Sequence, residues 1–331
     1  MRYIYTGGLK ISQFSLGTVQ LGMDYGINNT QGKPKREQSF EILNTALRLG
    51  VNCLDTSVGY GDSERLIGEW LRGIPENDRP LIVTKVDRLD FHSKAALRSS
   101  LRESLRISKT RLGLERIPLL MIHNFDQYAE DPEEVSKAFE ELRTQGEIER
   151  WGISAYSRHE YRMLAESSAD AVQIPQNIFD WGQITGGGWD ALARSGKIIY
   201  VRSVFLQGLV FMKPDRLPPQ MAFAAPTLER FHSLCREFSM EPAILAISFV
   251  LSLPGVSSLV LGCERKEQVE NDAELICKAR HLTEKQMEQL RKAFEQVDPR
   301  VTDPGTWFNS GWGQLDDGDS CGFKHTMDDT V

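Results

Sequence analysis

Four ionisable residues could together perform chemistry on a carbonyl group: Asp55, Tyr60, Lys85 and His123. A phenol with a pKa near ~10 is a poor acid at neutral pH, but a neighbouring ammonium stabilises the phenolate and lowers that pKa. Lys85 supplies such an ammonium, and Asp55 would keep it charged. His123 can hydrogen-bond a substrate oxygen. The four residues therefore predict a site that polarises a carbonyl and protonates its oxygen while a hydride reaches the carbon.

Taken singly, each of these residues has an ordinary structural explanation as a loop acid, a surface lysine, a packing tyrosine or a satisfied histidine. Their combination is more informative. A lysine that ends the apolar run 81–84 and a histidine that ends the run 118–122 would be costly to bury without partners. The chain contains no G-x-G-x-x-G, P-loop, H-E-x-x-H or G-x-S-x-G motif. We expect no metal site.

An alternation of apolar strands with amphipathic helices would position these residues. Asp55 ends a predicted strand, and the apolar stripe over 66–71 predicts a helix with Ser63 as its N-cap. Near-continuous apolar strands indicate a parallel sheet buried on both faces, and eight of them indicate a (β/α)8 TIM barrel. The carboxyl ends of such strands share one face, so the four residues should converge there. The eight strands are predicted at residues 14–19, 51–55, 81–85, 117–123, 148–154, 171–176, 197–203 and 257–262.

Two further segments flank the predicted barrel. The pair Gly7-Gly8 between short alternating runs predicts an N-terminal β-hairpin. A helix over 283–296 follows the eighth unit. We therefore expect one barrel domain over residues 1–297 and a C-terminal tail over 298–331, which is either a disordered end or a cover over the barrel mouth.

The composition narrows the class of protein. The chain has 331 residues and a net charge of −7, and it lacks a Lys/Arg stripe, which argues against nucleic-acid binding. The N-terminus has no apolar signal region, and the most apolar segment, 243–253, is shorter than the ~20 residues of a membrane span. Five cysteines without C-x-x-C spacing indicate reduced thiols. We expect a cytoplasmic protein that binds no membrane; its oligomeric state stays open.

The run 55–64, with Lys85 after Ile-Val-Thr and His123 after Leu-Met-Ile, resembles the aldo-keto reductases. The resemblance covers roughly residues 5–295, including the hairpin and Leu16-Gly17-Thr18. It implies a (β/α)8 reductase that uses NADPH without a Rossmann fold. It also implies that Tyr60 is the general acid, that Lys85 and Asp55 tune it, and that His123 orients the carbonyl.

The resemblance extends to segments that hold the cofactor in this family. Ser154 resembles the serine presented to the carboxamide, and Gln173 matches a family glutamine there, but Ala155 stands where the family usually has Asn. The segment 203–209 resembles the loop that crosses the pyrophosphate. Arg202 stands where an aromatic often stacks on the nicotinamide, and a guanidinium can also stack.

The segment 262–271 resembles the part of the family fold that binds the adenosine end. Arg265 or Lys266 could pair with a 2′-phosphate, which would favour NADPH over NADH, and Asn271 or Asp272 would contact the adenine. The resemblance thus implies a set of cofactor-binding residues: Gly17, Thr18, Ser154, Gln173, Arg202, Ser203, Leu206, Gln207, Gly208, Gly262, Arg265, Gln268 and Asn271.

The expected function is an NADPH-dependent reduction of a small-molecule aldehyde or ketone, with alcohol oxidation as its reverse. The polar loops 24–31 and 176–183 suggest a sugar-like substrate, and four aromatic residues could line its pocket: Tyr25, Trp181, Trp307 and Trp312. Two alternatives stay open. One is an NADPH-binding regulatory subunit with slow turnover, like the β-subunits of potassium channels; the other is an aldolase that uses Lys85 as a Schiff-base nucleophile.

Overall fold

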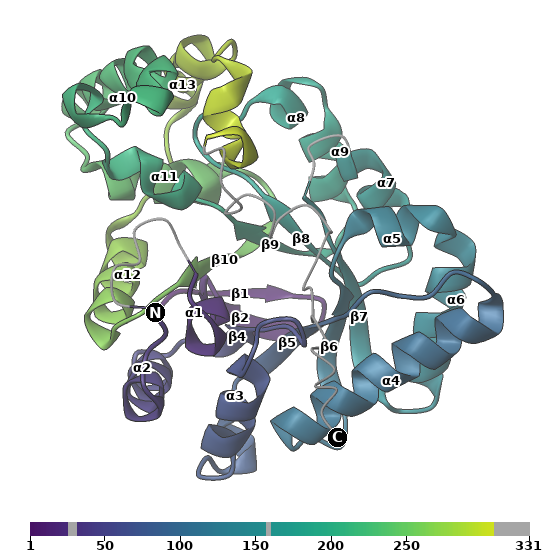
Figure 1. Cartoon of the computed structure of the whole chain (residues 1–331). Helices are drawn as coiled ribbons and strands as arrows, with labels where there is room; N and C mark the ends of the chain where they lie inside the picture. Colours follow the sequence, from purple (N-terminus) through teal and green to yellow (C-terminus); the bar gives the residue numbers. More distant parts are fainter. Residues whose placement is uncertain (26–31, 157–159, 308–331) are drawn as a thin grey trace, which may run out of the picture.

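The computed structural model describes residues 1–25, 32–156 and 160–307. Eight parallel strands close into a barrel in the order β10-β3-β4-β5-β6-β7-β8-β9, enclosed by helices (Figure 1). The predicted (β/α)8 TIM barrel is confirmed. The barrel strands are β3 (Phe14–Gly17), β4 (Cys53–Asp55), β5 (Leu81–Val86), β6 (Ile117–Ile122), β7 (Ile148–Ser154), β8 (Ala171–Pro175), β9 (Ile198–Arg202) and β10 (Val256–Gly262).

The helices alternate with these strands along the chain, and α10, α11 and α13 pack together at one side of the barrel (Figure 1). The α-helices are α1 (Val19–Gly22), α2 (Arg36–Arg48), α3 (Ser63–Leu71), α4 (Lys94–Leu112), α5 (Phe125–Glu130), α6 (Pro132–Thr144), α7 (Tyr161–Glu166), α8 (Gly182–Thr185), α9 (Gly188–Arg194), α10 (Ala225–Phe238), α11 (Pro242–Ser252), α12 (Lys266–Lys278) and α13 (Glu284–Phe294). Short 3-10 helices are η1 (Glu76–Asp78), η3 (Leu206–Phe211), η4 (Pro214–Arg216), η5 (Pro219–Ala224), η6 (Pro299–Thr302) and η7 (Pro304–Thr306).

Local sequence signals set several helix ends. The Asp131 side chain accepts a hydrogen bond from Glu134 N, and Pro132 occupies the first turn of α6. The α4 helix ends at Gly113, which has a left-handed conformation with φ 67°. The predicted N-cap of α3 is wrong by one residue: Ser63 is the first helical residue, and Asp62 is the N-cap. The Ser63 hydroxyl is used elsewhere, as described below.

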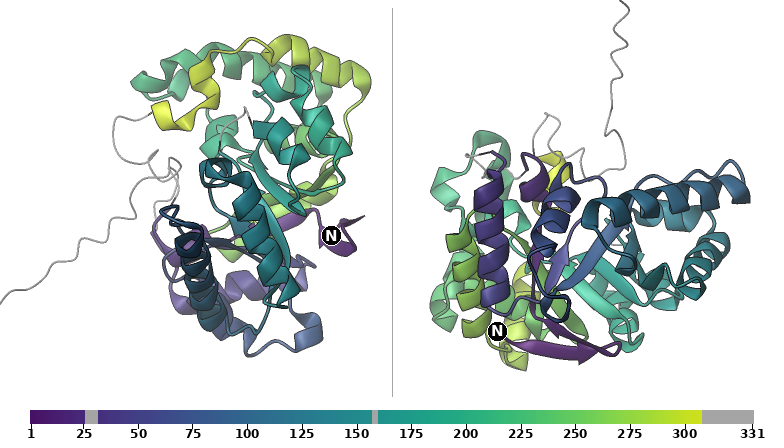
Figure 2. Two further views of the ribbon diagram at one scale, coloured as in Figure 1. Left: turned by 90° about the vertical axis from the view of Figure 1, so that its right-hand side faces the viewer. Right: turned by 90° about the horizontal axis from the view of Figure 1, so that it is seen from below.

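The N-terminal hairpin closes one end of the barrel (Figure 2). Strands β1 (Tyr3–Thr6) and β2 (Leu9–Ser12) pair antiparallel around Gly7 and Gly8, both with positive φ, as a tight hairpin turn requires. Ile11 of β2 joins the buried cluster that fills the barrel interior, together with side chains of several barrel strands. The predicted hairpin is confirmed, and it leaves the opposite end of the barrel for the candidate site.

The described part of the C-terminal tail packs on the barrel. Residues 299–307, at the yellow end of the chain in Figure 2, lie against η5, and the guanidinium of Arg300 lies 4.5 Å from the Phe223 ring centre. Trp307 is 2% exposed and belongs to the main core, so it does not line a pocket. Trp312 and the rest of the tail lie outside the described residues. The domain boundary at residue 297 remains a prediction.

Two other observations bear on the expectations from composition. Among the described residues, no helix has the length and apolar character needed to cross a membrane. The four cysteines in this part of the chain are all free, and three are buried: Cys53, Cys235 and Cys263.

Candidate active site

A buried ion pair forms the base of the site at the carboxyl ends of β4 and β5. Lys85 is 0% exposed, and its Nζ donates to Asp55 Oδ1 at 2.7 Å and to the Thr56 carbonyl at 3.0 Å. Gln173 on β8 also donates to Asp55 Oδ1, at 2.7 Å. A buried ammonium is costly unless it is paired. The carboxylate therefore compensates the lysine charge, and the glutamine fixes the carboxylate.

Tyr60 lies on the loop between β4 and α3, above this pair. Lys85 Nζ is 5.0 Å from the centre of the Tyr60 ring. The backbone of α1 presses against the loop: a Cβ on Gly22 would lie 1.7 Å from Tyr60 O, and a Cβ on Gly61, which has φ +52°, would lie 2.4 Å from Gly22 O. Only glycine fits such an approach and such a φ. These two glycines therefore allow α1 to pack directly on the backbone of the loop that carries Tyr60.

A chain of hydroxyl groups anchors the same loop. Thr56 Oγ1 donates to Ser63 Oγ at 2.9 Å, Ser63 Oγ donates to Thr18 Oγ1 at 2.8 Å, and Thr18 Oγ1 donates to the Asp55 carbonyl at 2.8 Å. All four residues are buried. The hydroxyl of Thr18 and its backbone N–H, 3.0 Å from the same carbonyl, tie β3 to β4, and its role in cofactor binding stays a prediction.

His123 completes the cluster at the end of β6. Its ring meets the Tyr60 ring edge-on, with centroids 5.6 Å apart, and its Nδ1 lies 3.3 Å from Ser57 Oγ. Burial, followed by the charges of Lys85 and Arg202, lowers the pKa of His123 to about 3. The imidazole is therefore neutral at pH 7. The structure thus brings all four predicted catalytic residues together at one end of the barrel.

The comparisons with known proteins agree with this geometry. A sequence profile described as "Aldo/keto reductase family" matches residues 13–295. The chain belongs to the aldo/keto reductase family. This membership indicates that the protein is an oxidoreductase, which acts on a small-molecule carbonyl compound with a nicotinamide cofactor.

Two curated relatives of this aldo/keto reductase have named activities. The D-threo-aldose 1-dehydrogenase of a Pseudomonas species is 26% identical over 303 residues, which cover 81% of this chain and 90% of the relative. The NADH-specific methylglyoxal reductase of Escherichia coli is 25% identical over 328 residues, which cover 88% and 98%. A solved aldo-keto reductase from Bacillus halodurans, in its holo form, superposes with a TM-score of 0.70 over 91% of this chain and 99% of its own, at 21% identity, which shows the fold.

The residues expected to meet the nicotinamide lie around the same mouth. Ser154 ends β7 and is 1% exposed, and its Oγ has no hydrogen-bond partner among the described residues. Buried hydroxyls are normally satisfied, so this oxygen is suited to a ligand group such as a carboxamide. Gln173 is not available in the same way, because its Nε2 donates to Asp55.

Arg202, at the end of β9, takes part in a stack that the sequence did not predict. Its guanidinium lies 4.4 Å from the ring centre of Tyr156, which in turn lies 6.1 Å from the His123 ring. The guanidinium also donates to the Ala155 carbonyl at 3.0 Å and to Ser203 Oγ at 3.2 Å. Tyr156 directly follows Ala155, where the family usually has Asn, and that departure was the sequence signal that pointed to this position.

The loop after β9 has an unusual backbone. Ser203, Leu206 and Gln207 have φ of 62°, 46° and 51°, and Gly208 follows with φ 90°. Positive φ at residues other than glycine is strained and concentrates at ligand sites. The segment expected to cross a pyrophosphate is therefore held in a special conformation, with Leu206 buried and the other three residues partly exposed.

The expected adenosine-end residues surround the start of α12. Gly17 and Gly262 are register partners where β3 and β10 end, and a Cβ on Gly262 would lie 2.4 Å from the Gln20 amide. Arg265 is exposed at the N-cap, and Gln268 Oε1 accepts from the backbone N–H groups of Glu264 and Arg265 at 2.7 and 3.1 Å. Gln268 therefore braces the helix start.

The two candidates for the adenine contact differ in environment. Asn271 is exposed on α12, whereas Asp272 is buried and accepts a hydrogen bond from Cys263 Sγ at 3.5 Å. Burial raises the pKa of Asp272 to about 7. Of the two side chains, the exposed amide of Asn271 is the one open to a ligand.

The side chains expected to define the substrate pocket have other contacts. Trp181 is buried against Phe249, with ring centroids 5.2 Å apart. In the polar loop after β8, Gln176 Nε2 donates to the Asp180 carbonyl at 2.6 Å, and Asn177 Oδ1 accepts from Phe179 N at 3.0 Å. These side chains brace the core and the loop.

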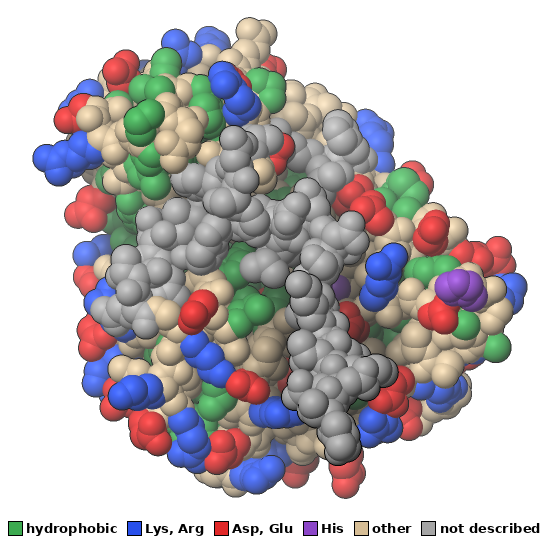
Figure 3. Space-filling model, in the orientation of Figure 1, with side chains coloured by type: hydrophobic (Ala, Val, Ile, Leu, Met, Phe, Trp, Pro, Cys, Tyr) green, Lys and Arg blue, Asp and Glu red, His purple; other side chains and the backbone are tan. Residues whose placement is uncertain are grey.

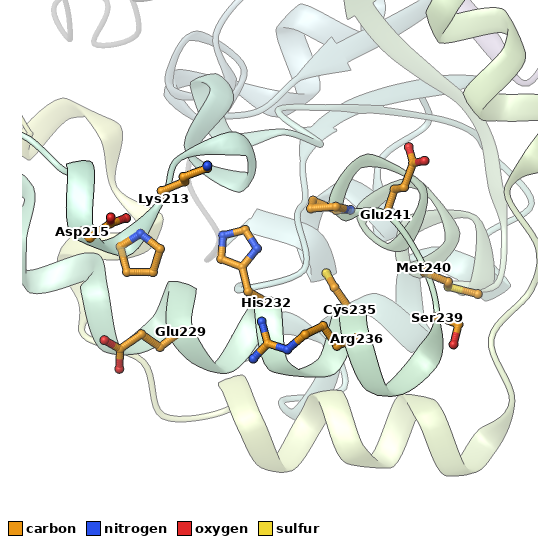
Figure 4. A pocket seen from close by; sticks show the side chains of 11 residues that line it. Lys213, Asp215, Glu229, His232, Cys235, Arg236, Ser239, Met240 and Glu241 are labelled. Carbon is orange, nitrogen blue, oxygen red and sulfur yellow. The ribbon is translucent and has the colours of Figure 1, made fainter.

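Other possible sites lie away from this cluster. A cavity of about 650 Å³ lies among η4, α10 and the start of α11, where basic and acidic side chains such as Lys213, Arg236, Asp215 and Glu229 face it together (Figure 4). Among the residues that the structure describes, no group of three or more His, Cys, Asp or Glu side chains is arranged to hold a metal ion.

Proposed function

We propose that this aldo/keto reductase is an NADPH-dependent carbonyl reductase that transfers hydride to an aldehyde or ketone, with Tyr60 as the general acid and alcohol oxidation as its reverse. One observation carries the proposal. The buried Lys85 ammonium lies 5.0 Å from the Tyr60 ring centre, and Asp55 balances its charge at 2.7 Å. A cation at that position stabilises the phenolate that forms when Tyr60 gives up its proton.

The neutral His123 supports the same proton transfer. Ser57 Oγ lies closer to His123 Nδ1, at 3.3 Å, than to the Lys85 carbonyl, at 3.5 Å, so we propose that its proton goes to Nδ1. The ring proton is then on Nε2, which can donate to a carbonyl oxygen. His123 then orients the substrate, and Tyr60 Oη gives its proton to the same oxygen. The hydrogen bond from His123 and the proton from Tyr60 act where negative charge develops on the oxygen.

A nicotinamide cofactor, when bound, supplies the hydride. The unsatisfied buried Ser154 hydroxyl and the strained 203–208 loop are features that such a ligand would use. We propose that Ser154 holds the carboxamide, the 203–208 loop holds the pyrophosphate, and the start of α12 holds the adenosine end.

We further propose that NADPH is preferred over NADH. Arg265 is exposed, and Lys266 makes one exposed ion pair, with Glu41 at 3.3 Å, so both can reorient toward a 2′-phosphate. The test is the ratio of KM values for NADH and NADPH in wild type and in Arg265→Ala/Lys266→Ala. The double substitution should raise KM for NADPH about tenfold or more and leave KM for NADH within about twofold. A wild type that prefers NADH would refute this preference.

The decisive experiment compares wild type, Tyr60→Phe and Tyr5→Phe. Consumption of NADPH and NADH is followed with sugars, keto-sugars, methylglyoxal and simple aldehydes. Tyr5 is 78% exposed on the hairpin and serves as a matched control. Loss of a general acid should lower kcat about 10²–10⁴-fold in Tyr60→Phe, with cofactor binding retained, and Tyr5→Phe should match wild type.

The other outcomes discriminate the alternatives. Cofactor binding without reduction of any carbonyl would refute the proposal and favour a regulatory subunit. Borohydride trapping of a substrate on Lys85, without a need for NADPH, would refute it in favour of an aldolase. A Tyr60→Phe variant with the wild-type rate would remove Tyr60 from the chemistry.

A further inference from the structure

A basic surface pocket lies between α3 and α4, and its lining includes none of the residues predicted for the active site or the cofactor. It has a volume of about 540 Å³, and four of the seven residues that line it are arginines. The lining consists of Arg65, Glu69, Arg72, Arg106, Ile107, Thr110 and Arg111. The whole chain is acidic, with a net charge of −7. On the face shown in Figure 3, basic and acidic side chains are interspersed around the edge of the molecule. Such a local excess of arginine is therefore a specific feature.

The packing of the two helices forms the base of this pocket. A Cβ on Gly68 of α3 would lie 2.1 Å from the Arg111 carbonyl of α4, so the two backbones touch there. Arg65, Glu69 and Arg72 are spaced at i, i+4 and i+7 and therefore follow one side of α3. Backbone contact fixes the distance between the two rows of side chains, so the pocket is a built feature of the fold.

The acidic groups near this pocket are already engaged. Glu69 accepts two hydrogen bonds from Arg36 Nε, at 3.0 and 3.1 Å, and Asp62, three residues before Arg65, pairs with Lys33 at 2.6 Å. The hydrogen bond from Arg36 lowers the pKa of Glu69, and the hydrogen bond from Lys33 lowers the pKa of Asp62. Both acids therefore stay ionised and bound to other cations.

The arginines themselves fall into two groups. Arg106 pairs with Glu103 at 2.6 Å. Arg111 donates to the Val58 carbonyl at 2.9 Å and pairs with the buried Glu64 at 3.5 Å. Arg65 and Arg72 make no ion pair with any residue that the structure describes. Like charges held at one pocket repel each other. The nearby carboxylates Asp62 and Glu69 attract Arg65 and Arg72, but their hydrogen bonds go to Lys33 and Arg36.

We propose that this pocket binds a small soluble anion of the phosphate class with two or more negative charges, such as a diphosphate or a phosphorylated metabolite. Guanidinium groups are planar donors that match phosphate oxygens in pairs. Arg65 and Arg72 bind the anion from α3, and Arg106 binds it from α4. The cavity beside α10 carries no such preference, because it faces both signs of charge.

The experiment titrates sodium pyrophosphate into full-length protein saturated with NADP⁺, by calorimetry in low-salt buffer, so that the cofactor phosphates occupy their own site. The test variant is Arg65→Ala/Arg72→Ala. The control is Arg102→Ala/Arg116→Ala, which removes the same charge from two exposed arginines outside the pocket. The test variant should bind pyrophosphate about tenfold more weakly or worse, and the control should stay within about twofold of wild type.

A thermal measurement separates binding from misfolding. Without ligand, the test variant should melt at or above the wild-type temperature, because repulsion among the four clustered arginines is reduced. Pyrophosphate should raise the Tm of wild type and control but not of the test variant. Equal weakening in both double variants, or no binding by wild type at millimolar pyrophosphate, would overturn the proposal. Binding to phosphatidic acid vesicles without binding of pyrophosphate would overturn the assignment of a soluble ligand.

Discussion

The Asp55–Lys85 pair offers a quantitative test of how the candidate site is held together. Lys85 is 0% exposed, and its ammonium depends on Asp55 Oδ1 and the Thr56 carbonyl. Removal of one partner from a buried pair leaves an uncompensated charge or an unsatisfied group, which costs about 3–5 kcal/mol. Asp55→Asn and Lys85→Met should therefore each lower the free energy of unfolding by about that amount.

The double variant decides whether the two residues act as a pair. If their effects were independent, Asp55→Asn/Lys85→Met would lose about 6–10 kcal/mol, which approaches the whole stability of an ordinary domain. Because the double variant contains no buried charge at these positions, we expect a loss of about 2–4 kcal/mol instead. The coupling energy should therefore be about 2 kcal/mol or more in favour of the pair.

Urea unfolding followed by tryptophan fluorescence and by circular dichroism measures these quantities at equilibrium. A matched control is Lys137→Met with Glu133→Gln, an exposed i, i+4 pair on α6 with N–O distance 2.5 Å, for which we expect a coupling of about 0.5 kcal/mol or less. The reasoning would be refuted by single effects at Asp55 and Lys85 that add to within about 0.5 kcal/mol. All three Asp55 and Lys85 variants should also lose carbonyl reduction.

The remaining predictions concern other parts of the site. Gly22→Ala places a methyl 1.7 Å from Tyr60 O and should cost about 3 kcal/mol by urea unfolding and lower kcat; unchanged kinetics would contradict the role of this contact. Ser154→Ala removes an unsatisfied buried hydroxyl, so the apo protein should gain about 1 kcal/mol while cofactor Kd, measured by fluorescence titration, rises about tenfold; an unchanged Kd would remove Ser154 from the cofactor site. Burial raises the pKa of Asp272 from 3.8 to about 7, so the folded state binds the extra proton between these values and loses stability as pH rises through them. Asp272→Asn should therefore be about 2–4 kcal/mol more stable at pH 8, and the gain should vanish near pH 4. The pKa of His123 falls from 6.5 to about 3 in the folded state, so the unfolded state binds the extra proton and the free energy of unfolding rises with pH between these values. His123→Asn should lack this pH-dependent part of the stability. In wild type, kcat/KM should show no titration of a histidine between about pH 5.5 and 8.

The sequence by itself determined the barrel and the four candidate catalytic residues. Strand periodicity is a local property, and the eight apolar segments lie close to the observed β3 to β10. Parallel closure then requires that residues at the carboxyl ends of strands meet on one face, whatever the loops do. Asp55, Lys85 and His123 could therefore be placed together from their positions at the ends of strands. Tyr60 could be placed with them because it lies in the short loop that follows Asp55.

Only the tertiary structure decided how those residues are held. The contact of Gly22 with the Tyr60 backbone and the bond from Gln173 to Asp55 join segments that no spacing rule links. Ser63 was predicted as a helix cap because that is the usual local role of serine, but its hydroxyl bonds to Thr18 across the fold. Hydrogen bonds and close contacts between distant segments depend on distances of a few tenths of an ångström, and only the packed barrel defines those distances.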